Sequence, residues 1–228
     1  MLIKAVVILV VLIAAAVPVA ASLGWLALAL QAIESPMPLH RALGDMVWQT
    51  GTDFLLVAIP MFVLMGEMLL RAGVTERMYD GMIKWLGWLP GGLMHSNIGS
   101  SALFAATSGS SVATAATIGT VALPQIEQRG YNEPLFLGSV AAGGTLGILI
   151  PPSINLILYG LLTDTSVPEL YLAGFLPGLA LSMLFMLTII VFCKLKPSWG
   201  GERVSYSWAE KIAALPALLP LFFIFLVV

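Results

Sequence analysis

The sequence from residue 141 to residue 153 reads AAGGTLGILIPPS and interrupts an apolar segment of membrane-spanning length. No charged residue occurs between Pro134 and Thr163, which indicates a segment that lies in a lipid bilayer. Proline removes a backbone donor and disfavours a helical conformation in the residue before it, so Pro151 and Pro152 predict a break in the helix. Lipid cannot satisfy the backbone groups freed by such a break, which is tolerated only where protein or a cavity surrounds it. Because secondary transporters bind ions and substrate at broken helices, the pattern predicts a transporter.

The composition is that of a polytopic membrane protein. Apolar residues make up 59% of the chain and charged residues 10%, whereas a soluble domain has about 25% charged residues. One cysteine, Cys193, and two histidines, His40 and His95, argue against a disulfide framework and against a cysteine- or histidine-rich metal centre. The sequence contains no Gly-rich phosphate-binding loop and no basic patch, so it suggests neither ATP hydrolysis nor nucleic-acid binding.

The apolar segments predict an all-α fold in three parts. Residues 1–52 hold a first transmembrane helix over 4–30, which is longer than a signal peptide's apolar core of about 7–15 residues, and an outer loop. Residues 53–193 form a transport repeat, and 194–228 a cytoplasmic loop followed by the start of a truncated span. Within the repeat we expect a span at 53–71, an interfacial amphipathic helix at 72–90, a re-entrant hairpin at 93–126, a broken span at 134–163 and a span at 169–193.

The hairpin is predicted from a segment with no Asp, Glu, Lys or Arg over residues 93–126. This segment is too long for one span of about 20 residues and too short for two complete spans. At its centre, Thr107-Ser108-Gly109-Ser110-Ser111 is a poor helix interior and a good turn. The simplest solution is a helical hairpin whose tip stops inside the membrane.

The distribution of basic residues supports this topology. With the N-terminus in the cytoplasm, nine of the ten Lys and Arg residues lie on the inner side and only Arg41 lies outside. The inner residues are Lys4, Arg71, Arg77, Lys84, Arg129, Lys194, Lys196, Arg203 and Lys211. If 93–126 crossed the membrane once, the basic stretch 194–211 would move outside. A crossing after Lys211 leaves the chain outside, so we expect a second, inverted repeat beyond Val228, without which this half is inactive.

The hairpin tip and the helix break form the candidate site. Hydroxyl groups and unwound backbone carbonyls suit Na⁺, a hard cation that takes oxygen ligands. The helix N-terminus that follows the break could also face a substrate carboxylate. The alternative is close packing of small residues in a turn and a kinked helix. The candidate sodium- and substrate-binding residues are Thr107, Ser108, Gly109, Ser110, Ser111, Gly143, Gly144, Thr145, Gly147, Pro151, Pro152, Ser153 and Asn155; those for Na⁺ itself are Ser108, Ser110, Gly144 and Thr145.

Other polar residues have structural explanations. Glu67 is the only acidic residue deep in its span, which by default suggests a functional site. Arg71 follows one helical turn later, so a charge-paired helix end near the inner interface is favoured over a proton relay. His95 is expected at the membrane surface. We expect interhelical hydrogen bonds from Asn97, Ser100 and Ser101, and membrane anchoring by Trp25, Trp48, Trp85, Trp88 and Trp208.

Several spaced motifs resemble the large membrane subunit of TRAP transporters, the tripartite ATP-independent periplasmic transporters. The motifs are IPMFVLMGEMLLRAG at 59–73, SGSSVA at 108–113, PQIEQRGY at 124–131, GILIPPS at 147–153 and AGFLPG at 173–178. The resemblance runs from about residue 50 to residue 193. The family's subunit is longer, and this chain corresponds to its N-terminal half.

The resemblance implies two inverted repeats, each with a hairpin and a discontinuous helix, and a transport domain that moves like an elevator. It implies sodium-driven uptake of organic acids, typically carboxylates, across the bacterial inner membrane, with no cofactor other than the coupling ion. It also implies two partners: a small four-helix membrane subunit and a periplasmic substrate-binding protein.

Three other functions fit parts of the sequence. A sodium symporter or proton antiporter would share the hairpin and would not require a soluble periplasmic partner. An intramembrane serine protease would use Ser108 or Ser110, but a nucleophilic serine needs a base within hydrogen-bond reach, and both histidines are expected near the interfaces. A purely structural membrane subunit would tolerate a bulky residue at Ser110.

Overall fold

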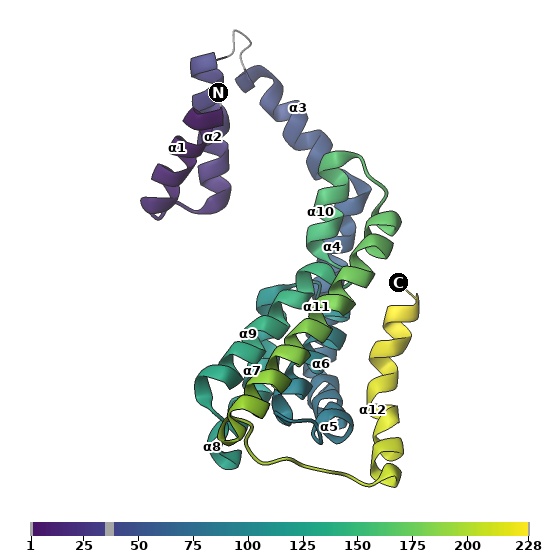
Figure 1. Ribbon diagram of the computed structural model, residues 1–228. Helices are drawn as coiled ribbons and strands as arrows, with labels where there is room; N and C mark the ends of the chain where they lie inside the picture. The colour runs from purple at the N-terminus through teal and green to yellow at the C-terminus, as the bar shows by residue number, and fades with distance from the viewer. Residues whose placement is uncertain (1, 35–38, 228) are drawn as a thin grey trace. The chain divides into compact units, whose positions relative to one another are not determined.

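The computed structural model describes residues 2–34 and 39–227, which fold mainly into α-helices (Figure 1). Among these residues, the single β-type contact is a backbone bridge between Tyr131 and Gly200. The predicted all-α fold is therefore confirmed. The chain divides into two compact units, Met1–Asp53 and Phe54–Val228.

Unit 1 contains two short apolar helices where the sequence predicts one long helix. Its helices are α1 (Leu2–Ala14), α2 (Val19–Glu34) and α3 (Leu39–Gly51), and α1 packs against α2. Between them Ala16 takes a positive φ of 56°. The break follows from Pro18, which cannot donate a backbone hydrogen bond and keeps the residue before it out of the helical region. The continuous apolar run over 4–30 is thus not a single helix.

Unit 2 contains the remaining elements. They are η1 (Phe54–Val57), α4 (Ala58–Arg71), α5 (Val74–Leu86), α6 (Leu93–Ser108), α7 (Ser111–Ala122), α8 (Gln125–Arg129), α9 (Glu133–Leu149), α10 (Ile154–Thr163), α11 (Val167–Leu195), η2 (Pro197–Trp199) and α12 (Trp208–Val227). Three segments are long and apolar enough to cross a membrane, namely Phe54–Arg71, Glu133–Thr163 and Val167–Leu195. They match the spans expected at 53–71, 134–163 and 169–193.

Helix α6 is the centre of unit 2. All of its residues except Ala102 and Leu103 are buried or nearly so, and it contacts α4, α5, α7, α9, α11 and α12. Its apolar side chains join a core with residues of α5, α7 and α9, including Tyr79, Ile118 and Phe136. A helix that is buried all round needs neighbours on every side. The first arm of the uncharged segment 93–126 is therefore enclosed within the unit, whereas α7 has exposed residues such as Val112.

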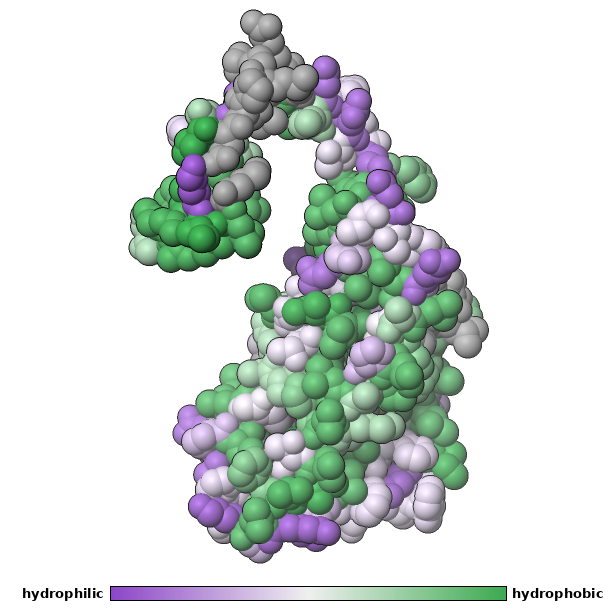
Figure 2. Space-filling model, turned by 45° about the horizontal axis from the view of Figure 1, so that its top comes forward, coloured by the Kyte–Doolittle hydropathy of each residue, from purple (hydrophilic) through white to green (hydrophobic). Residues whose placement is uncertain are grey.

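The outer helices of unit 2 expose apolar side chains. On α11, Leu172, Leu176 and Leu184 are among the exposed residues. Figure 2 shows apolar side chains over much of the visible face, with hydrophilic groups at its lower end and along its upper part. An exposed apolar surface of this extent is typical of a protein that lies in lipid or against partner chains.

Helix α5 lies where an amphipathic helix is expected over 72–90, and its place at a membrane interface remains a prediction. It begins after Gly73, which has a φ of +66°, and its buried residues include Met78, Tyr79 and Ile83. It packs along α6 on one side and along α12 on the other. Its apolar face therefore contacts protein in this unit.

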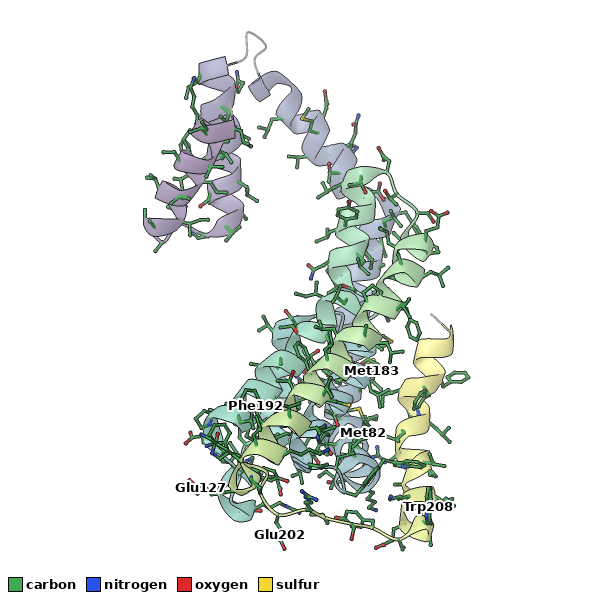
Figure 3. The ribbon with its side chains drawn as sticks, viewed as in Figure 1. Met82, Glu127, Met183, Phe192, Glu202 and Trp208 are labelled. Carbon is green, nitrogen blue, oxygen red and sulfur yellow. The ribbon has the colours of Figure 1, made fainter. Side chains whose placement is uncertain are left out.

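A buried tyrosine fastens three segments at the base of the α6–α7 hairpin. The Tyr131 hydroxyl accepts a hydrogen bond from the Leu93 backbone N–H at 2.9 Å and donates one to the Glu202 carbonyl at 3.3 Å. Burial raises the pKa of Tyr131, so its hydroxyl keeps the proton that it donates. Figure 3 shows Glu202 on the loop between α11 and α12, at the end of the unit where Glu127 of α8 lies. The tyrosine thus joins the start of α6 to this loop.

We expect Tyr131→Phe to destabilise the base of the hairpin. The change removes both hydrogen bonds and leaves the buried Leu93 N–H without a partner, which costs roughly 1–3 kcal/mol. Thermal unfolding of the purified protein should occur a few degrees lower. Tyr206→Phe is the control. Tyr206 lies on the loop between α11 and α12 that Tyr131 contacts, and its hydroxyl makes no hydrogen bond in the described structure. Equal unfolding temperatures for the two variants would contradict this role of Tyr131.

Candidate ion and substrate site

The hairpin turns within two residues, and the local sequence explains the turn. Gly109 ends α6 in the left-handed conformation, with φ +57°, which glycine adopts without a steric penalty. Ser110 is extended, and its hydroxyl accepts a hydrogen bond from the Ala113 N–H at 3.4 Å, as an N-cap of α7. The prediction of a helical hairpin with its tip at Thr107–Ser111 is therefore confirmed in shape. Its position within a membrane remains a prediction.

The tip carries a compact set of hydroxyl groups. The Ser108 and Thr114 hydroxyls are 2.8 Å apart, and the Thr114 hydroxyl also donates to the Ser110 carbonyl at 2.8 Å. The Thr107 hydroxyl is buried and donates to the Phe104 carbonyl of its own helix at 2.8 Å. The Ser108 hydroxyl is thus hydrogen-bonded to Thr114 of α7, whereas the Thr107 hydroxyl is hydrogen-bonded within α6.

The break in the second apolar segment lies at Ile150–Ser153, between α9 and α10. Ile150 and Ser153 have extended backbones, as expected next to proline. The Ser153 hydroxyl donates to the Ile148 carbonyl at 2.7 Å, so it satisfies one of the carbonyls at the end of α9. The predicted discontinuous helix is therefore present, and the break comes after Gly143, Gly144 and Gly147, which lie within α9.

The hairpin tip contacts this break directly. The Ile154 N–H, at the start of α10, donates a hydrogen bond to the Gly109 carbonyl at 3.3 Å. A Cβ atom on Gly109 would lie 3.1 Å from the Pro152 carbonyl oxygen. The tip and the break, which the sequence places about 40 residues apart, thus form one site.

Helix α9 lies close to both arms of the hairpin because its glycines face them. A Cβ on Gly147 would lie 2.9 Å from the Ser110 carbonyl oxygen, and a Cβ on Gly144 would lie 2.7 Å from the Ala115 Cβ. Gly143 faces the other arm, where a Cβ would lie 2.5 Å from the Ser101 hydroxyl. Small residues allow helix backbones to approach this closely. The glycines therefore have a packing role whether or not an ion binds.

The structure brings most of the candidate residues together but leaves two outside the contact. Thr107, Ser108, Gly109, Ser110, Ser111, Gly144, Gly147, Pro151, Pro152 and Ser153 lie at or beside the contact between the hairpin and the break, and Gly143 faces the first arm of the hairpin at Ser101. Thr145 lies on the exposed face of α9, and its hydroxyl donates to the Ala142 carbonyl at 2.7 Å. Asn155 is also exposed. Sequence alone did not show which face of α9 meets the hairpin, and Thr145 lies on the opposite face from Gly144 and Gly147.

A cavity of about 240 Å³ lies beside the tip, between α4, the hairpin and the start of α10. Its lining includes Gly66, Glu67, Ser108, Ser110, Thr117 and Ile154. Helix α4 approaches the tip at Gly66, where a Cβ would lie 3.4 Å from the Thr107 carbonyl oxygen. Sequence analysis missed this approach, although Gly66 in an apolar span was a visible sign of close packing.

Glu67 follows Gly66 and forms the predicted ion pair with Arg71. The carboxylate oxygen and Arg71 Nε are 2.7 Å apart. The pair is confirmed, whereas its place near the inner interface remains a prediction. The pair lies at the level of the hairpin tip. The sixteen residues of α6 place this tip about 24 Å from the base of the hairpin, at 1.5 Å per residue.

Other polar predictions have mixed outcomes. The Asn97 amide donates to the Ser139 hydroxyl at 2.8 Å, and its carbonyl accepts from the Tyr79 hydroxyl at 2.6 Å, so its interhelical role is confirmed. Ser100 and Ser101 are buried without a hydrogen-bond partner, contrary to expectation. His95 is fully buried in the protein, and its Nε2 lies 2.8 Å from the Pro90 carbonyl oxygen. Its place at the level of the membrane surface remains a prediction.

The histidine's position also bears on the serine protease alternative. His95 and Ser108 lie at opposite ends of α6, about 20 Å apart along a helix that rises 1.5 Å per residue. A nucleophile and its base must be within hydrogen-bond reach. His95 therefore cannot activate Ser108 or Ser110.

The family model of the DctM component of tripartite ATP-independent periplasmic transporters matches residues 6–228. This chain belongs to that family. A C4-dicarboxylate TRAP transporter large permease protein of Pseudomonas aeruginosa is 39% identical over 165 residues, which cover 72% of this chain and 39% of the relative. A sialic acid TRAP transporter large permease protein of Vibrio cholerae is 35% identical over 181 residues, which cover 79% of this chain and 42% of the relative.

An ectoine TRAP transporter large permease protein of Halomonas elongata is also similar, with 33% identity over 176 residues, 74% of this chain and 40% of the relative. The alignments thus span about two fifths of the length of these relatives. The resemblance noted in the sequence is confirmed, and the chain is a multi-pass membrane protein of a transporter family rather than an enzyme family.

We expect Gly147→Ala to disturb the contact between α9 and the hairpin tip. The new methyl group would press on the Ser110 backbone, and overpacking of this kind costs typically 1–3 kcal/mol. The unfolding temperature of the purified protein should fall. Gly138→Ala on the same helix is the matched control, because a Cβ there has no atom within 4 Å. If both variants unfold at the wild-type temperature, the tip and α9 are not tightly packed.

Proposed function

We propose that the chain is part of the membrane subunit of a sodium-coupled secondary transporter. The transporter takes up organic acids, typically carboxylates, that a periplasmic binding protein delivers. A small four-helix membrane subunit is its second partner, and it works in the bacterial inner membrane with the N-terminus in the cytoplasm. The observation that carries the proposal is the contact between the hairpin tip and the helix break, seen in a chain of the TRAP transporter family.

The ends of four helices at this contact suit an ion and an anionic substrate. Helices α6 and α9 end here, and helices α7 and α10 begin here. The carbonyl groups at a helix C-terminus carry partial negative charge and attract cations, whereas the N–H groups at an N-terminus attract anions. Broken helices in transporters use their ends in this way.

The individual residues then have distinct roles in the proposal. The Ser108 hydroxyl and the last carbonyls of α6 supply oxygen ligands for Na⁺, and Gly144 and Gly147 let α9 approach closely enough to share the site. The start of α10 after Ser153 faces a carboxylate group of the substrate. Thr145 and Asn155, which are exposed, are available to a partner segment or to the second repeat. Bound Na⁺ would couple its gradient to uptake.

The complete transporter would place this half opposite an inverted second repeat, and an elevator-like movement would carry the shared site across the membrane. The family match favours dependence on a binding protein over a symporter or antiporter that works without one. Uptake by the complete complex with and without the soluble binding protein separates these functions.

We expect Ser110→Trp to abolish most sodium-dependent uptake by the complete complex while leaving its assembly intact. The indole would fill the tip where Ser110 contacts α9 and lines the cavity. Uptake of a radiolabelled carboxylate into vesicles, with and without a sodium gradient, measures the effect. Val112→Trp is the matched control, since Val112 lies next to the tip and is 77% exposed. Normal uptake at wild-type sodium affinity in Ser110→Trp would overturn the site.

A further inference from the structure

The cavity beside the hairpin tip has one charged group in its lining. Glu67 is the only ionisable residue among those that line it, and the hydroxyl-bearing residues Ser108, Ser110 and Thr117 line it as well. The carboxylate therefore belongs to the same space as the hydroxyl that the proposed ion site uses. From the sequence, a charge-paired helix end is favoured for Glu67 over a proton relay.

The level of this carboxylate is unusual for a structural ion pair at a helix end. Gly66 contacts the tip, so Glu67 lies beside the place where α6 ends rather than at the base of the hairpin. An ionised group on an apolar span such as Phe54–Arg71 is expensive to keep, and it is usually retained for ion or substrate binding. The position of Glu67 in the lining of the cavity is consistent with such a binding role.

Arg71 pairs with the carboxylate from outside the cavity. Its Nε contacts one carboxylate oxygen at 2.7 Å, and its side chain is 80% exposed. It does not line the cavity. The second oxygen of Glu67 has no hydrogen-bond partner within the described structure, and an exposed arginine can move away from the first. A cation can therefore approach the carboxylate from the cavity side.

The chemistry of the lining suits a monovalent cation. Divalent cations prefer several carboxylates or imidazoles, and no group of three or more His, Cys, Asp or Glu residues occurs in the described part of the chain. One carboxylate with hydroxyl and carbonyl oxygens carries a single negative charge, which one Na⁺ neutralises. The cavity volume of about 240 Å³ also leaves room for water molecules around the ion.

We propose that Glu67 is a cation-binding residue at the mouth of the hairpin-tip site, where it draws Na⁺ into the cavity beside Ser108. Arg71 is its partner when no cation is present and is displaced when one enters. This inference rests on the proposed sodium-coupled function and adds to it a residue of α4, a helix outside both the hairpin and the broken helix.

The test measures cation binding separately from transport. A ligand that binds only the folded state stabilises it by RT ln(1 + [L]/Kd), so the dissociation constant for Na⁺ is obtained by following thermal unfolding of the complete, purified transporter as NaCl replaces choline chloride at constant ionic strength. For Glu67→Gln, this half-saturating Na⁺ concentration should rise roughly tenfold, the effect of losing about 1.4 kcal/mol of binding. For Arg71→Gln it should fall, because the carboxylate loses its competitor.

A purely structural ion pair gives a different pattern. The two variants would then lower the unfolding temperature equally at every salt concentration and leave the half-saturating Na⁺ concentration unchanged, which would overturn the inference. Glu76→Gln, an exposed glutamate of the neighbouring helix α5, is the matched control and should behave as wild type. If Glu67→Gln does not fold, Glu67→Asp keeps the charge on a shorter side chain and should shift the same concentration less; no shift overturns the inference.

The failure of the proposed function has its own outcome. If the wild-type transporter shows neither stabilisation by Na⁺ nor sodium-dependent uptake, then sodium coupling itself is wrong. If the wild type is stabilised by Na⁺, Ser110→Trp loses that stabilisation and Glu67→Gln keeps it at the wild-type concentration, then the hairpin-tip site stands and only the role of Glu67 fails.

Discussion

The hydrogen bond from the Ile154 N–H to the Gly109 carbonyl is the contact on which the site depends. Both groups lie where a helix is interrupted, in segments too apolar for water to satisfy them. Each interruption therefore supplies the partner that the other lacks. This contact therefore stabilises both the hairpin tip and the broken helix.

Close packing enforces that contact. Gly144 and Gly147 bring α9 against the second arm of the hairpin, and Gly143 brings it against the first. Around them α6 is enclosed by six other helices, and Tyr131 fixes the base of the hairpin to the loop after α11. Interiors packed to this density shift as units rather than deform locally. The tip and the break thus pack together as one body.

The distribution of charge around the hairpin tip is a second constraint on the site. The hairpin segment has no Asp, Glu, Lys or Arg between residues 93 and 126, so the ionised group nearest to its tip in the cavity lining comes from α4. Helix ends provide partial charges at fixed positions, while Glu67 provides a full charge that Arg71 can share or release. The arrangement places both kinds of charge around one cavity.

The sequence by itself determined the all-α fold, the hairpin turn at Gly109 and the break at Pro151, because proline, glycine and missing charges act on the backbone within a few residues. Pro18 carried the same local information, but the long apolar run over 4–30 outweighed it in the prediction. Only the tertiary structure decided that Gly144 and Gly147 face the hairpin while Thr145 faces outward, that His95 is buried, and that Glu67 lies beside the tip. These features depend on how distant segments pack through space, and local backbone chemistry does not encode which faces meet.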